Sequence, residues 1–278
     1  MSTTTLTAPR TRVSFGGVLR SEAIRFFSLT STKVLIIVAI VVSVGFSALG
    51  VWGVGQMATQ FAGMPEMGMP DAAAPGFMEE MTGSGVVFTQ LILGALGVLL
   101  ASGEFTTGSA VSTFLASPQR TRVLAAKAVL ITLATVVAQV AATLLSFAAA
   151  KPIASSFDLP LELASSEFMT VLGYGALGAV VAALIGLCLG ILLRSSAGGI
   201  TVLVALFFVL PLALQVLVAF VDWVKQAVAY MPDQLTLSLA MPMSYPSELE
   251  TWQQLLGVAG WIIVPLVLAG WALKSRDI

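Results

Sequence analysis

The sequence predicts an all-α membrane protein with six transmembrane helices, and both hydropathy and charge placement indicate this. Of the 278 residues 58% are hydrophobic and only 10% are charged, which leaves too little polar surface to cover a soluble globule. A helix needs roughly 20 apolar residues to cross a bilayer core of about 30 Å. The uncharged runs that reach or approach this length are 34–54, 86–103, 128–150, 168–193, 195–221 and 251–273.

Charged residues alternate between the connections that join these runs. Eleven of the thirteen Lys and Arg lie in the two terminal segments and in the connections between the second and third and between the fourth and fifth runs. Eleven of the fourteen Asp and Glu lie in the other connections. Basic residues near the ends of spans are retained in the cytoplasm. We therefore expect both termini to be cytoplasmic and residues 34–278 to form a single six-helix transmembrane domain.

The first span is preceded by two short segments. Residues 1–12 are rich in Thr and predict a mobile cytoplasmic tail, whereas residues 13–33 predict an amphipathic helix in the membrane interface. Apolar residues recur there at steps of three and four, with Arg12, Arg20, Glu22 and Arg25 on other faces. The apolar set is Phe15, Val18, Leu19, Ala23, Phe26 and Phe27. The alternative is an ordinary basic flank that only orients the first span.

Two of the outer connections have distinctive compositions. The first contains Met64, Met67 and Met69, whose thioethers are soft ligands for Cu(I). The alternative is that these methionines supply adaptable apolar contacts. The last outer connection, 222–250, holds apolar stretches too short to span, broken by proline, and predicts a hairpin that re-enters or caps the outer face.

Several function classes are excluded by what the sequence lacks. Without histidine there is no Ser/His or metal/His intramembrane protease, and the adjacent Glu79 and Glu80 lie outside the spans. No lysine stands in a P-loop frame, so the chain does not hydrolyse ATP by itself. The spans contain no ionisable residue of the kind that couples a secondary carrier to an ion. We expect no catalytic residue and no nucleic-acid partner.

Glycine and proline positions in the spans predict how the helices pack and where they bend. Gly186 and Gly190 have the spacing that lets two helices approach closely, either within one chain or between two. Pro211 and Pro265 are expected to kink the fifth and sixth spans.

The most specific segment is the cytoplasmic connection 104–122. It begins Gly103-Glu104-Phe105-Thr106-Thr107-Gly108-Ser109 and continues through Leu115-Ala116-Ser117-Pro118-Gln119-Arg120 to Arg122. This pattern resembles the permease subunit of bacterial ABC transporters of the type-2 exporter class, in which a Glu ends the second span and a Gly and Thr follow before a Leu-x-x-Pro-x-x-Arg pattern. The arginine position is met by Arg120 or Arg122. Physically, Glu104 at the membrane edge is suited to charge-assisted hydrogen bonds, although it could instead only cap a helix.

The resemblance implies a function for the chain. The segment from about Thr106 to Ala116 would be a coupling helix resting on a separate ATPase. The residues that this resemblance assigns to coupling are Glu104, Thr107, Gly108, Leu115, Pro118, Arg120 and Arg122. Two copies of the ATPase would bind ATP and Mg, and two permease subunits, identical or not, would form an export pathway for hydrophobic or amphipathic cargo across the bacterial cell membrane. The alternatives are a non-transporting scaffold or sensor subunit, or copper-related transport through the methionine loop.

Overall fold

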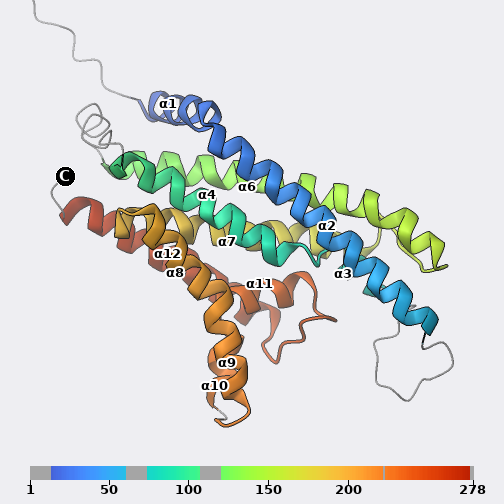
Figure 1. Ribbon diagram of the computed structural model, residues 1–278. Helices are drawn as coiled ribbons and strands as arrows, with labels where there is room; N and C mark the ends of the chain where they lie inside the picture. Colours follow the sequence, from blue (N-terminus) through green and yellow to red (C-terminus); the bar gives the residue numbers. More distant parts are fainter. Residues whose placement is uncertain (1–13, 61–73, 107–119, 222, 276–278) are drawn as a thin grey trace, which may run out of the picture.

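The structure is a computed structural model that describes residues 14–60, 74–106, 120–221 and 223–275 (Figure 1). Every regular element in these ranges is a helix, which confirms the all-α fold class. Six helical stretches are long and apolar enough to cross a membrane, and each contains most or all of one predicted run. The protein is therefore a multi-pass membrane protein. The stretches are Thr30–Gln60, Phe77–Phe105, Thr121–Ser156, Ser166–Leu193, Ser196–Val218 and Thr251–Ser275.

The described helices follow one another along the chain in the following order. The elements are α1 (Phe15–Ser28), α2 (Thr30–Gln60), α3 (Phe77–Met81), α4 (Val86–Thr106), α6 (Arg120–Ser156), α7 (Ser166–Leu193), α8 (Ser196–Val204), the π-helical turn η2 (Ala205–Val209), α9 (Leu210–Val218), α10 (Trp223–Ala229), α11 (Pro232–Ala240) and α12 (Thr251–Ser275).

Helix α7 forms the centre of the bundle. In its most apolar stretch 78% of the residues are buried, against 17% in the fifth and sixth spans. It packs most closely on α4, where the helices meet without intervening side chains. A Cβ atom on Gly186 would lie 2.0 Å from the carbonyl oxygen of Gly94, and one on Gly97 would lie 2.1 Å from that of Ala183. The glycines at 186 and 190 thus serve a contact within one chain.

The fifth span is interrupted where its proline was expected to kink it. Helix α8 gives way to η2, and Pro211 follows in the first turn of α9. Because Pro211 has no N–H, the carbonyl of Phe207 lacks its usual donor, and a π-turn accommodates this mismatch. Helix α12 in contrast continues through Pro265 without a break.

Charged residues gather at the two ends of the bundle. Helix α1, the last turns of α4, α7 and α12 and the first turn of α6 lie at one end, which we call the basic end (Figure 1). Helices α3, α10 and α11 lie toward the other, the acidic end. Described basic side chains at the basic end include Arg25, Lys33, Arg122, Lys127, Arg194 and Lys274. Described acids toward the acidic end include Glu79, Glu80, Asp158, Glu162, Glu167, Asp233, Glu248 and Glu250.

Helix α1 lies across the basic end and packs on α6. Ser14 caps its start by accepting a hydrogen bond from the amide of Gly17 at 3.2 Å. The buried face of the helix is Val18, Glu22 and Phe26, whereas Phe27 is 56% exposed. The expectation that Glu22 lies on another face than the apolar residues was therefore wrong, because Glu22 shares the buried face with Val18 and Phe26 and pairs with Lys127 of α6.

Candidate functional site: an ion cluster at the basic end

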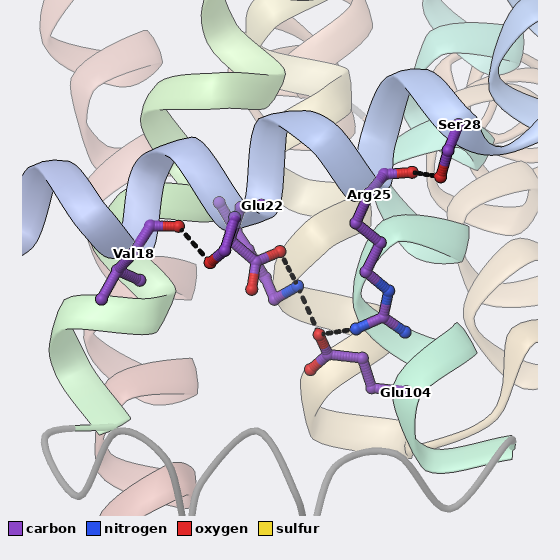
Figure 2. Close-up of polar contacts among 7 residues, drawn as sticks. Val18, Glu22, Arg25, Ser28 and Glu104 are labelled. Atoms are coloured by element: carbon purple, nitrogen blue, oxygen red, sulfur yellow. Dashed lines mark hydrogen bonds and ion pairs between the residues drawn. The ribbon is translucent and has the colours of Figure 1, made fainter. Parts of the chain in front are cut away.

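Four charged side chains from three helices meet at the basic end (Figure 2). Lys127 of α6 donates hydrogen bonds to Glu22 Oε2 of α1 and to Glu104 Oε1 of α4, both at 2.7 Å from its Nζ atom. Arg25 of α1 forms a second ion pair with Glu104. We call these four residues the ion cluster.

The ion cluster is buried and electrically balanced. The side chains of Glu22, Glu104 and Lys127 are at most 5% exposed, and that of Arg25 is 34% exposed. Two carboxylates face two cations, so the cluster adds no net charge to the interior. Removing such ions from water is costly, and the cost is offset only when each charge has a close partner of opposite sign. The cluster therefore fixes how α1, α4 and α6 sit against one another.

The local sequence explains why these side chains converge. Glu22 and Arg25 are three positions apart on α1, so they lie on neighbouring faces of one turn. Glu104 is in the last turn of α4 and Lys127 is in the second turn of α6, on either side of residues 107–119. A crevice of about 10 Å³, enough for one water molecule, lies beside them and is lined in part by Glu104, Lys127 and Phe105.

A further cation lies beside the cluster. Arg194 ends α7 in the left-handed conformation with a φ of 51°, and its amide donates to the carbonyl oxygen of Gly190. Its guanidinium lies 5.3 Å from the ring centre of Phe105, a cation–π contact. The end of α4 is thus joined to α1, α6 and the α7–α8 turn.

The structure describes only part of the predicted coupling segment. Glu104 lies in the ion cluster and makes the charge-assisted hydrogen bonds that its position suggested. Arg122 is exposed on the first turn of α6, and Arg120 begins that helix. Thr107, Gly108, Leu115 and Pro118 lie outside the described residues, as do Met64, Met67 and Met69.

Sequence reasoning missed the other members of the cluster. From the sequence, Lys127 is only one of the basic residues between spans two and three, and Glu22 and Arg25 are residues on the other faces of the amphipathic helix. A signal was present, because Glu22, Glu104 and Asp277 are the only acids on an otherwise basic side. An isolated acid among cations near a span is a candidate for a buried ion pair.

The two glutamates of α3 anchor loops at the acidic end. Glu80 accepts hydrogen bonds from the amides of Met243 and Ser244 and from the Ser244 hydroxyl, all at 2.8 Å. Glu79 accepts one from the amide of Glu162 at 2.8 Å. Both carboxylates are buried, and each holds a different connection against α3. This arrangement supports a structural role for the pair.

Comparison with known proteins found no match to any protein-family model and none to a curated protein. Within the part of the chain that the structure describes, no group of three or more Asp, Glu, Cys or His side chains could hold a metal ion.

Proposed function

We propose that this chain is the permease subunit of an ATP-binding-cassette exporter driven by separate ATPase subunits. The observation that carries the proposal is the ion cluster, which binds together the two helices that flank residues 107–119. That segment has the sequence pattern of a coupling helix. The six membrane-spanning helices and the basic end are consistent with this assignment.

The described contacts suggest how force would pass through the chain. A push on residues 107–119 would act on the end of α4 and the start of α6, which Lys127 and Glu104 hold together. Glu22 and Arg25 would make α1 move with them. Because α4 packs on α7 by direct backbone contact, the displacement would reach the central helix without being absorbed by flexible side chains.

The chain would catalyse no reaction itself, and it would contribute two arrangements of the permease subunits. ATP and Mg would be bound by two ATPase subunits, and their closure would favour one arrangement of a pair of permease subunits, identical or not. The pathway between them would suit hydrophobic or amphipathic cargo, because the spans are apolar. By the positive-inside rule the basic end faces the cytoplasm of a bacterial cell.

The first test is purification of the tagged chain from its native membrane in mild detergent. We expect a P-loop ATPase to co-purify at about one copy per permease chain, with vanadate-sensitive ATP hydrolysis that cargo stimulates. Co-purification without any turnover would favour the alternative, a scaffold or sensor subunit. Absence of a nucleotide-binding partner in several detergents would contradict the proposal.

A set of variants tests the coupling role. We expect Glu104→Gln, and Arg120→Glu combined with Arg122→Glu, to lower cargo-stimulated ATP hydrolysis while the chain still inserts in the membrane. The matched control is Glu248→Gln, a carboxyl-to-amide change at an exposed site on the acidic end. Wild-type stimulation in both test variants would exclude coupling through this segment.

A further inference from the structure

Helix α11 runs from inside the bundle outward to the acidic end. Its last residue, Ala240, belongs to a cluster with Val86, the first residue of α4. One turn earlier, Thr236 accepts a hydrogen bond from the Gln90 side-chain amide at 3.1 Å and sits against Gly178 of α7. Gln90 and Gly178 lie one turn and about three turns into their helices. The N-terminus of α11 therefore points into the bundle.

Asp233 lies in that buried first turn. The residue is 7% exposed, and its Oδ1 atom has no hydrogen-bond partner among the described residues. No salt bridge among those residues includes it. The Asp233 carboxylate does receive backbone hydrogen bonds from Gln234 and from its own amide, but these leave Oδ1 without a partner among the described residues. Asp233 is thus a buried acid without a cation, which is an expensive state when ionised.

The elements around Asp233 hold few titratable groups. Tyr245 follows α11, and the negative charge of Asp233 adds to burial in raising the pKa of that phenol. Helix α7 presents Tyr174, α10 carries Lys225, and Tyr230 lies in the turn after α10; Lys225 and Tyr230 are both exposed. In α12 the titratable residue is Lys274, at the opposite end. Binding a proton is therefore the least costly way, in free energy, to neutralise the buried carboxylate.

We propose that Asp233 is a proton-binding site through which acidity at the acidic end controls how tightly residues 223–240 pack on α7 and α12. This inference stands independently of the proposed transport function. When the carboxyl is neutral, burial of the first turn of α11 is tolerated. When it ionises, water is drawn to Oδ1, and the turn loosens together with α10.

The contacts of residues 223–240 allow this loosening to move α10 and the first turn of α11. Helix α10 buries only Val224, and the turn that joins it to α11 is held by a hydrogen bond from the Trp261 indole to the Tyr230 carbonyl at 2.9 Å. The outer part of α11 is in contrast well anchored through Thr236 and through Ser238, which donates to Gln254 at 3.0 Å. Movement is therefore expected in α10 and the first turn of α11.

The direction of the pH effect follows from the pKa. Burial raises the pKa of Asp233 from 3.8 to about 6, although the backbone amides of Gln234 and Asp233 act in the opposite sense. A raised pKa means that Asp233 binds its proton more tightly when residues 223–240 are packed than when they are loosened. Packing is therefore tightest below about pH 4 and weakens as the pH rises to about 6. A shift of about two pH units corresponds to about a hundredfold change in the ratio of loosened to packed protein.

The test uses the full chain in lipid nanodiscs with a spin label on α10. Cys188 is replaced by Ala so that Gln226→Cys, on the exposed face of α10, carries the only label. We expect label mobility to rise between about pH 4 and about pH 6 in the otherwise wild-type chain. In the Asp233→Asn chain, which keeps a neutral side chain of the same shape, we expect low mobility from pH 4 to 8.

The control and a second measurement keep the result interpretable. Glu248→Gln removes an exposed carboxyl from the same connection and should leave the transition in place. If Asp233→Asn does not assemble, the pH profile of the chain that keeps Asp233 still tests the proposal. A flat mobility profile of that chain from pH 4 to 8 would overturn it. An unchanged transition in folded Asp233→Asn would overturn it as well.

Discussion

Replacing Lys127 with Met is the sharpest test of the ion cluster. The Lys127 side chain is 4% exposed, and its ammonium lies 2.7 Å from a carboxylate oxygen of both Glu22 and Glu104. Met fills similar space without charge, so packing is largely kept. Glu104 would retain Arg25, but the ion pair that holds Glu22 would be lost.

The size of the effect follows from burial. Removing one partner of a buried ion pair costs about 3–5 kcal/mol, because the remaining charge stays out of water. For a chain of this size that corresponds to a fall of roughly 6–20 °C in Tm. Arg25→Met should cost only about 1 kcal/mol, since its side chain is 34% exposed and a paired surface charge contributes little.

The assay is thermal unfolding in detergent, followed by loss of the monodisperse chromatographic peak at a fixed heating schedule, because membrane proteins commonly unfold irreversibly. Lys33→Met, an exposed lysine on α2 at the same end, is the matched control and should melt close to wild type. Adding Glu22→Gln and Glu104→Gln to Lys127→Met should restore most of the lost Tm, because the buried charges are removed together.

Two results would refute this reasoning. The first is a Tm for Lys127→Met within about 1 °C of wild type, which would mean that the lysine contributes no buried ion pair. The second is a triple variant less stable than Lys127→Met alone. That outcome would show that the carboxylates stabilise the helices through other contacts.

Two further predictions concern packing and the acidic end. Gly186→Ala should sharply reduce the yield of folded protein, because its Cβ would lie 2.0 Å from a backbone carbonyl oxygen of α4, whereas Gly173→Ala, with nothing within 4 Å, should express normally in the same chromatographic assay. Glu80→Ala should leave two backbone amides and a hydroxyl after α11 without their acceptor, at about 1–3 kcal/mol for each group that stays buried. Limited proteolysis should then cut that connection faster than in Glu248→Gln, and equal rates would contradict the anchoring role.

Local signals predicted the helices and some of their interruptions. Apolar runs are continuous stretches, so the run of 251–273 predicts nearly the whole of α12. The break in the fifth span followed from Pro211, whose missing N–H is a property of one residue. The glycines at 186 and 190 indicated close helix approach, but their partner helix could not be identified from spacing alone.

The sequence by itself determined the number of membrane-spanning helices and the division of charge between the two ends. Both depend on hydrophobicity and charge counted along the chain, and need no knowledge of which helices touch. Only the tertiary structure decided that Glu22 turns inward to Lys127, that Glu104 joins three helices, and that Asp233 is buried without an ion pair to any described residue. The physical reason is that the free energy of a charge depends on its burial and on partners up to 105 residues away, which only folding brings within 3 Å.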